Sequence, residues 1–437
     1  MTDTGKILQQ LRDFESRNVT FVEPDGSWPI IWERAKGVHV WDADDHKYLD
    51  LTAAFGVAAA GHANPRVVKA GQQQMARLLH AMGDVHPHAL KAQLARELSR
   101  ITFERWTKTN PHSALRTPQS GKVIFSNSGF EAVESALKTA ILATGRHGII
   151  AFTGAYHGLG YGALNATHRD FFRKPFRPQL REFAHFVQFP AATADFATVE
   201  FQIRQLLRRE WIGAILVEPV QARGGINVPP PGFLPLLRKL CDESGALLIA
   251  DEIYTGFGRT GKWFACEHSG VAPDLICLGK ALTGGFPLSA CVGRADLMDA
   301  AWPASTGEAI HTSTFLGHPV GCAMALAQIA EIEELKLPER AAELGGFLLA
   351  KLRSKIPNGK FKVAVRGLGL MAGVELRRSD GSPAAAEAFA AVKTLLQRGF
   401  IFLPEGEHGS VISFTPPLTI TKAQLAKSVA ALAEVLK

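Results

Sequence analysis

Two short apolar runs, Ala246-Leu247-Leu248-Ile249-Ala250 and Leu275-Ile276-Cys277-Leu278, decide the fold of this chain. Strands of a parallel sheet that is covered on both faces read as unbroken apolar runs, and open α/β sheets place their chemistry just beyond the carboxyl ends of such strands. The first run is closed by Asp251 and the second by Gly279 and Lys280. Burial there lowers the pKa of a lysine and so favours its uncharged amine. The uncharged amine is the nucleophile that forms an imine with an aldehyde. A lysine at a strand end is more often a surface residue, so the run by itself leaves both interpretations open.

Further apolar runs alternate with helical stretches between residues 120 and 320. Segment 130–144 carries apolar residues at helical spacing and is followed by Gly145, which is typical of a helix end. Alternation of this kind predicts a mostly parallel sheet covered by helices. The predicted strands span residues 122–125, 148–152, 213–217, 246–250, 275–278 and 289–292.

The two ends of the chain have a different pattern. Residues 36–51 suggest a hairpin with its turn at 42–45, and the tail from about residue 321 predicts a helix, a strand pair, a helix, a strand and a last helix. The strand pair is expected around 366–375 and the later strand at 411–414. Thr421 and Gln424 stand at capping-box spacing for the last helix.

Length and composition exclude several classes of protein. The chain has 437 residues, 46% of them hydrophobic and 20% charged, which is enough for a large core and two domains. Its apolar stretches fall short of the roughly 20 residues that a membrane helix needs. The first 18 residues are polar and mixed in charge, so no secretory signal is readable. We therefore expect a cytoplasmic protein with no membrane partner.

The formal charge of +7, from 48 basic and 41 acidic residues, is spread along the chain. A nucleic-acid-binding protein usually has a clustered basic stripe, so we expect no nucleic acid partner and a mild preference for anionic substrates. The five cysteines form no C-x-x-C pair, and His80, His86 and His88 suit no single helical face. The sequence therefore predicts neither a disulfide framework nor a metal site.

Two glycine-containing segments suggest phosphate binding. Ser126-Asn127-Ser128-Gly129-Phe130 joins a predicted strand to a helix, so free backbone N–H groups and the positive helix end face outward. An ordinary helix cap explains this segment about as well. Gly256 to Gly261 matches G-x-G-x-x-G, but residues 251–255 separate it from the strand, and Trp263 stands where a P-loop needs Ser or Thr.

The run from Asp251 to Gly261, together with Pro273 to Gly285, resembles the signature of class III aminotransferases, which are pyridoxal 5'-phosphate (PLP) enzymes of fold type I. The resemblance extends from about residue 30 to the C-terminus, with matching blocks in the family's order at 128–129, 154–158, 218–221 and 311–315. It implies an α/β fold of type I, with a mostly parallel central sheet in a large PLP-binding domain, residues 76–320. The N-terminal segment 1–75 and the C-terminal residues 321–437 are expected to build a smaller α+β domain.

The resemblance also assigns roles to single residues. Lys280 is expected to bind the PLP aldehyde as a Schiff base and then to move the proton between the substrate Cα and the cofactor. Asp251 is expected to keep the pyridine nitrogen protonated. The phosphate would be held by Ser128, Gly129 and the backbone N–H of Phe130.

Other matched positions surround the expected cofactor. Tyr156 is expected to stack on one face of the ring with His157 behind it, and Ile253 to press on the other face. Glu218 is expected to be a polar neighbour of the site. Thr314 is expected to reach the phosphate of the neighbouring subunit, which implies a homodimer.

Two further residues of the matched segment are not assigned a role in catalysis. Arg259 is expected to be structural, paired with an acid such as Glu252. Tyr254 stands where many members of the family have a glutamine.

The residues that choose the substrate differ from the family's common pattern. Many members have an arginine where this chain has Ser413, and a glutamate where it has Arg223. Either Arg223 is the carboxylate clamp, or the favoured amine has no carboxylate, or Arg223 is an ordinary surface residue. Phe55, Val57 and Asp84 stand where the family lines its substrate pocket, and Asp84 could receive a second ammonium group.

The leading functional hypothesis is an aminotransferase that moves an amino group from an amine, ω-amino acid or diamine to a 2-oxo acid, pyruvate or 2-oxoglutarate, by a ping-pong mechanism. The same cofactor site also supports amino-acid racemases, epimerases and aminomutases, which need no second substrate. A scaffold protein without catalysis is disfavoured, because the lysine, the aspartate and the phosphate site are all present.

Overall fold

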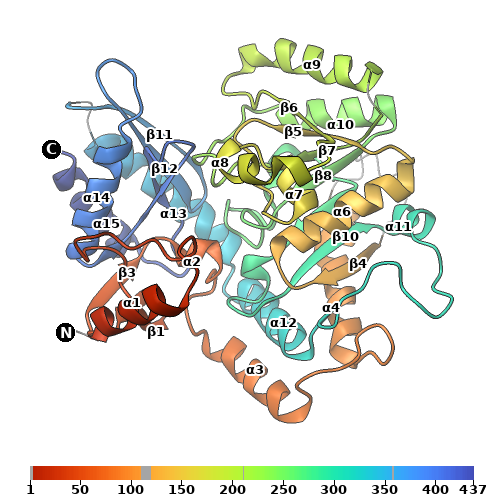
Figure 1. Cartoon of the computed structure of the whole chain (residues 1–437), viewed down its shortest axis with the longest axis horizontal. Coiled ribbons are helices and arrows are strands. Elements are labelled where there is room, and N and C mark those ends of the chain that lie inside the picture. The colour runs from red at the N-terminus through yellow and green to blue at the C-terminus, as the bar shows by residue number, and fades with distance from the viewer. Residues whose placement is uncertain (1–2, 110–119, 210, 357–358) are drawn as a thin grey trace.

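The computed structural model describes residues 3–109, 120–209, 211–356 and 359–437. A seven-stranded sheet lies in the larger part of the molecule, with strand order β4-β10-β9-β8-β7-β5-β6 (Figure 1). Strands β8 (Leu247–Asp251) and β9 (Leu275–Leu278) are parallel neighbours, so the two runs that predicted the fold end side by side. The mostly parallel α/β architecture predicted from the sequence is confirmed. The other strands are β4 Gly121–Ser126, β5 Gly148–Phe152, β6 Ala184–Val187, β7 Ile212–Val217 and β10 Ser289–Arg294.

Two strands of this sheet differ from the simplest expectation. Strand β10 runs antiparallel to both β9 and β4. Strand β6 was not predicted, because it is a short edge strand whose residues are mostly only half-buried. An edge strand with one neighbour lacks the continuous apolar run that marks a strand buried on both faces.

Alternate residues of the central strands face two hydrophobic clusters. On β8, Leu247 and Ile249 belong to the cluster that includes α6 (Gly129–Thr144), whereas Leu248 belongs to the larger cluster on the other side. Each fully buried Leu or Ile side chain stabilises the fold by roughly 1.5–3 kcal/mol. Because both faces are covered, the ends of the strands are where polar groups can meet a ligand.

Helix α6 begins and ends as its sequence predicts. Its buried residues form a stripe that faces the sheet, and Gly145 closes the helix with a φ of 67°. That left-handed conformation suits glycine, which has no Cβ to clash. The N-terminus of α6 therefore lies at the carboxyl end of β4, beside the ends of β8 and β9 in the same sheet.

The N-terminal and C-terminal segments of the chain come together in two smaller sheets. One has the order β1-β2-β3-β13, and its last pair is parallel, with Leu49 and Asp50 opposite Phe400 and Ile401. The other has the order β11-β12-β15-β14. Figure 1 shows these red and blue elements grouped beside the large sheet. The strands are β1 Trp32–Lys36, β2 His39–Asp42, β3 Lys47–Asp50, β11 Lys362–Leu368, β12 Met371–Arg377, β13 Phe400–Ile401, β14 Leu403–Glu405 and β15 Val411–Phe414.

The hairpin around residues 42–45, the strand pair around 366–375 and the strand at 411–414 are confirmed, and Thr421 and Gln424 form the predicted capping box. Helix α3 (Pro65–Arg77) packs along α12 (Pro319–Glu334), so the two predicted domain boundaries meet in space. The division into residues 1–75, 76–320 and 321–437 stays a prediction. Longer helices are α1 Asp3–Phe14, α4 Ala89–Ser99, α9 Phe196–Arg209, α10 Phe233–Ser244, α13 Leu337–Lys355, α14 Ala385–Gln397 and α15 Lys422–Val435.

Short helical segments complete the fold. They are α2 Ala53–Gly56, η1 Arg100–Glu104, α5 Arg105–Thr109, α7 Tyr161–Ala166, α8 Asp170–Arg173, η2 Lys174–Gln179, η3 Thr193–Asp195, η4 Ala265–Ser269, η5 Lys280–Leu282 and α11 Ala295–Ala301. All five cysteines are buried free thiols. Across the part of the chain that the structure describes, none of the helices combines the length and apolar character needed to cross a membrane.

Candidate active site

A cavity of about 360 Å³ opens at the carboxyl ends of β7, β8 and β9. Most of the residues predicted for the cofactor site line it, although they come from segments more than 150 positions apart in the chain. The tertiary structure therefore brings together what the sequence suggested only motif by motif. The predicted residues among its walls are Gly129, Phe130, Tyr156, His157, Glu218, Arg223, Asp251, Ile253 and Lys280.

Lys280 stands at the wall of this cavity, directly after β9 and Gly279. Its backbone has a φ of 45°, a left-handed conformation that is rare for a residue with a Cβ and is typical of functional sites. Its Nζ lies 4.6 Å from the centre of the Tyr254 ring. Burial lowers the pKa of Lys280, and the negative charge of Asp251 opposes that change. A lower pKa makes the free amine, the nucleophilic form, more available.

Asp251 and His157 form a buried pair behind the cavity. His157 Nδ1 lies 2.7 Å from Asp251 Oδ2, and the backbone N–H of Ile253 donates to Asp251 Oδ1 at 3.1 Å. The His157 backbone N–H donates to Thr167 Oγ1 at 2.9 Å, which fixes the backbone that carries the ring. The carboxylate is thus fixed in orientation at the cavity wall. Its place at the end of β8 follows directly from the apolar run before it.

The first turn of α6 provides the expected anion-binding end. The first N–H groups of a helix have no partner within the helix, and those of Gly129 and Phe130 belong to the cavity wall. A Cβ on Gly129 would lie 3.1 Å from two side-chain carbons of Ile253, so a larger residue there would push Ile253 aside. Glu131 Oε2 accepts from the Ser128 backbone N–H at 2.7 Å, which caps the helix as the sequence also allowed, and from the Ser128 hydroxyl at 2.9 Å.

Tyr156 and Glu218 are joined through the backbone. The Tyr156 N–H donates to Glu218 Oε1 at 2.9 Å, and the Ala222 N–H donates to Glu218 Oε2 at 3.1 Å. Burial raises the pKa of Glu218 to about 7, against the opposing effect of His157. Glu218 therefore fixes two loops of the cavity wall with both of its oxygens.

Arg223 extends along the wall next to Tyr156. Its guanidinium carbon lies 5.2 Å from the centre of the Tyr156 ring, within the range of a cation–π contact. Its Nε lies 3.9 Å from Glu405 Oε2, and the Gly406 N–H donates to the Arg223 carbonyl at 3.1 Å. The guanidinium is thus part of the cavity and is not an ordinary surface group.

Glu405, a charged residue behind Arg223 in the cavity wall, was missed in the sequence. It ends β14 and is 5% exposed. Burial raises its pKa to about 6, and Arg223 and Lys280 oppose that rise. No motif marks Glu405, because only the pairing of β14 with β15 carries it toward the cavity.

The interaction expected for Arg259 is wrong in its partner. Arg259 Nη1 donates to the carbonyl of Leu370 at 3.0 Å and to the carbonyl of Pro416. Glu252 instead accepts hydrogen bonds from the Thr255 hydroxyl and from the backbone N–H groups of residues 265 and 266. The structural role stands, because the buried guanidinium ties the glycine-rich turn to the C-terminal elements. Tyr254 directs its hydroxyl to Thr415 Oγ1 at 3.2 Å.

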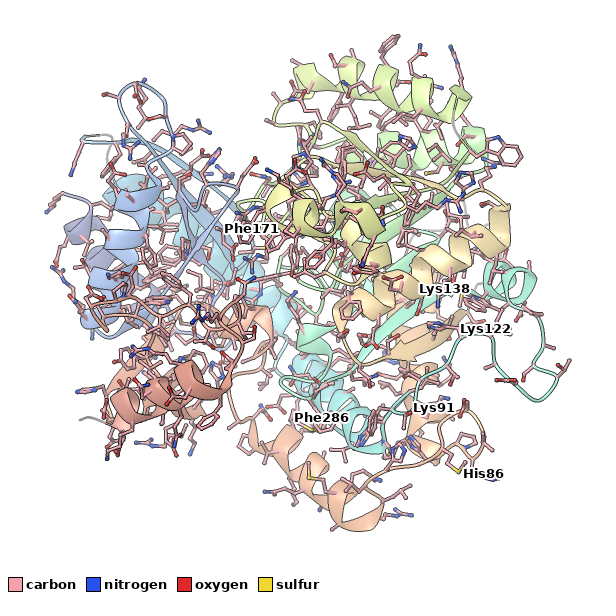
Figure 2. The ribbon with its side chains drawn as sticks, viewed as in Figure 1. His86, Lys91, Lys122, Lys138, Phe171 and Phe286 are labelled. Carbon is pink, nitrogen blue, oxygen red and sulfur yellow. The ribbon has the colours of Figure 1, made fainter. Side chains whose placement is uncertain are left out.

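Several predicted residues lie outside the cavity of the single chain. Phe55 lines a separate apolar pocket with Trp28 and Trp32, and Val57 is half-buried nearby in the chain. Asp84 is exposed and accepts a hydrogen bond from Thr312 Oγ1 at 2.6 Å; it lies two residues from His86, which Figure 2 labels. Thr314 is exposed in a turn. The expected roles of these residues stay predictions.

The sequence matches known proteins over almost its whole length. The family model described as aminotransferase class-III matches residues 21–436. The chain belongs to the class III aminotransferase family. A putrescine aminotransferase of Pectobacterium atrosepticum is 38% identical over 427 residues, covering 95% of this chain and 84% of that protein. An acetylornithine aminotransferase of Methanosarcina mazei is 38% identical over 400 residues, covering 92% of this chain and 90% of that protein.

Solved structures of aminotransferases have the same fold. The ornithine aminotransferase of Toxoplasma gondii matches with a TM-score of 0.84 at 28% identity, covering 100% of this chain and 95% of that one. An amine transaminase from an uncultivated Pseudomonas species, in its PLP-bound form, matches with a TM-score of 0.85 at 29% identity, covering 97% of this chain and 98% of that one. The fold type I architecture expected from the resemblance is confirmed.

The cofactor of this class III aminotransferase is PLP, and the residues of the cavity fit it. His157 Nε2 is buried without a hydrogen-bond partner among the described residues, and Gly129 and Phe130 at the start of α6 line the cavity. A phosphate suits the first turn of α6, a protonated pyridine nitrogen suits Asp251, and an aldehyde suits Lys280. When bound, PLP supplies the electron sink for breaking bonds at the carbon that carries the amino group.

Proposed function

We propose that this class III aminotransferase moves an amino group from an amine, ω-amino acid or diamine to a 2-oxo acid, such as pyruvate or 2-oxoglutarate, by a ping-pong mechanism. The observation that carries the proposal is Lys280 at the end of β9, which lines one cavity together with Asp251 and the first turn of α6. The relatives named above act on putrescine and acetylornithine by their names, and both of these carry an amino group remote from the other end of the molecule.

The residues of the cavity have separate roles in the proposed reaction. Lys280 is the base that takes a proton from the substrate carbon and returns it, since its lowered pKa favours the free amine. Asp251, oriented by His157, keeps a positive charge on the ring nitrogen opposite it. Tyr156 and Ile253 orient the ring between them, and the N–H groups of residues 129 and 130 bind the phosphate.

Arg223 is proposed to bind the carboxylate of the 2-oxo acid. It replaces, from the opposite wall, the arginine that the family often has at the position of Ser413. Ser413 is buried and donates its hydroxyl hydrogen to the Leu403 carbonyl at 3.1 Å, so it serves the sheet. A planar guanidinium beside an aromatic ring is well suited to hold a carboxylate.

The enzyme is proposed to work as a homodimer in which Thr314 reaches the phosphate in the neighbouring site. Thr314, Ile310 and Phe315 lie exposed in one segment of the chain. Exposed apolar side chains of this kind mark surfaces that bind a partner. A second copy would also explain why Phe55, Val57 and Asp84 lie outside the cavity of their own chain.

The test is a half-reaction followed by absorbance. Purified enzyme loaded with PLP is mixed with single amines and amino acids in the absence of any 2-oxo acid. We expect one or more amines to remove the absorbance of the lysine-bound cofactor stoichiometrically, and pyruvate or 2-oxoglutarate to restore it. Loss of optical purity in a chiral amino acid with the absorbance unchanged would instead identify a racemase or epimerase.

A further inference from the structure

The acidic residues at the cavity differ in how fully they are bonded. Asp251 is held by His157 and by the N–H of Ile253, and Glu218 accepts one backbone N–H on each oxygen. Glu405 is also buried, yet within the described residues its carboxylate accepts no hydrogen bond, and its contact with Arg223 is an ion pair at 3.9 Å. Its oxygens are not among the fully enclosed unpaired polar atoms of the described residues, so a donor from water or from a ligand can reach them.

Arg223, the partner in this ion pair, has one buried nitrogen without a hydrogen bond in the described part of the chain. Arg223 Nε is buried without a hydrogen-bond partner among the described residues, although the whole side chain is 35% exposed. The separation of 3.9 Å is too long for a hydrogen bond. The guanidinium therefore holds its position through the Tyr156 ring, and its exposed part leaves it a path outward.

Glu405 also lies within electrostatic reach of the reacting groups. Its charge opposes the lowering of the Lys280 pKa and contributes to the raised pKa values of Tyr156 and Tyr254. Glu405 stands directly behind Arg223, which lines the cavity beside Tyr156, so an outward movement of Arg223 would open the carboxylate to the cavity. Near pH 8 the carboxylate is ionised, since its pKa is about 6.

We propose that Glu405 binds the remote ammonium group of a diamine donor while the other amino group reacts at Lys280. The ammonium supplies the hydrogen bonds that the carboxylate lacks, and the Arg223 guanidinium swings outward as the ammonium takes its place. This proposal rests on the aminotransferase function proposed above and names the chemical class of its donor. It assigns to Glu405 the role that the sequence suggested for Asp84, which is exposed and bonded to Thr312.

The test compares two donors of equal length, 1,4-diaminobutane and butylamine, in the half-reaction without acceptor. For Glu405→Gln in the PLP-loaded enzyme we expect the second-order rate constant of the half-reaction with the diamine to fall by about 10- to 100-fold, mainly through weaker binding of the donor, with little change for butylamine. The matched control is Glu407→Gln, an exposed acid two residues further along the chain, which we expect to leave both donors unchanged. Thermal unfolding of each variant checks that it is folded.

Each other outcome overturns the proposal in a distinct way. An equal fall for both donors would show that Glu405 only supports the site, and an unchanged diamine rate would show that the ammonium binds elsewhere. A fall confined to the 2-oxo acid half-reaction would show that Glu405 acts by positioning Arg223. If the unaltered enzyme reacts with butylamine but no better with the diamine, the aminotransferase function stands and the diamine subsite fails. If it reacts with no amine at all, the proposed function itself fails.

Discussion

His157 Nδ1 lies 2.7 Å from Asp251 Oδ2, in a pair that is buried behind the cavity. The two residues come from different strand ends, 94 positions apart. Because the Asp251 carboxylate is held on one oxygen by a ring and on the other by a backbone N–H, it can face the cavity in one orientation only.

We expect Asp251→Asn to lower amino transfer by at least about 100-fold, because a neutral amide cannot hold the ring nitrogen of PLP in its protonated form. Single-turnover rates with a saturating donor measure this effect. His157→Gln, which leaves the carboxylate charged but less firmly oriented, should give a smaller loss. Equal rates for Asp251→Asn and the unaltered enzyme would contradict the assigned role.

Lys280→Ala is expected to abolish covalent attachment of PLP and to lower turnover by at least about 1,000-fold, because the variant loses both the nucleophile and the base. Mass spectrometry after borohydride reduction locates the attachment. Lys262→Ala, at an exposed lysine in the neighbouring glycine-rich turn, is the control and should keep both properties. Attachment that persists in Lys280→Ala would show that another lysine reacts.

If Arg223 binds the carboxylate of the 2-oxo acid, its loss should weaken the binding of 2-oxo acids and not that of simple amines. Arg223→Ala should raise the KM for 2-oxo acids by about 10-fold or more and leave the half-reaction with butylamine nearly unchanged, since butylamine has no carboxylate. Arg223→Lys should restore part of the loss. Unchanged constants for every 2-oxo acid and amine would remove Arg223 from the substrate site.

Thr314 offers a test of the shared site. A variant with Lys280→Ala and a variant with Thr314→Arg are each expected to be nearly inactive by themselves. If Thr314 serves the neighbouring site, refolding or co-expressing the two chains together produces mixed dimers with one intact site. Each mixed dimer should then have roughly half the activity of an unaltered dimer. If Thr314 serves its own chain, mixing restores nothing. Light scattering establishes that the species measured is a dimer.

The raised pKa of Glu252 predicts how the free energy of unfolding changes with pH. Burial raises its pKa from 4.5 to about 7, although Thr255 and two backbone N–H groups oppose the rise. Between these pH values the folded chain keeps a proton that the unfolded chain releases, so the free energy of unfolding falls as pH rises, by up to roughly 3 kcal/mol.

Urea unfolding of the PLP-loaded enzyme at several pH values measures this slope. Glu252→Gln should flatten it, because the amide does not titrate, whereas Glu343→Gln at an exposed site that pairs with Lys422 should not. Parallel slopes for Glu252→Gln and the unaltered enzyme would show that Glu252 is ionised in the fold at neutral pH.

The sequence by itself determined the buried strands of the central sheet and the residues at their ends. A strand that is buried on both faces of a sheet needs an unbroken apolar run, and such a run is a local signal. The sequence therefore predicts β8 and β9 together with the residues Asp251 and Lys280 that follow their apolar runs. The same holds for α6, whose stripe and closing glycine lie within one segment. The resemblance to a family added roles to these positions, since its motifs are also local.

Only the tertiary structure decided which charges meet across the cavity. Glu405 reaches Arg223 because β14 pairs with β15, and Arg259 binds two carbonyls of the C-terminal part in place of Glu252. These contacts join residues more than 100 positions apart, and no local pattern of apolar and polar residues encodes them. Burial and packing fix such pairs after the strands have formed, because an isolated charge in the interior is too costly to leave without a partner.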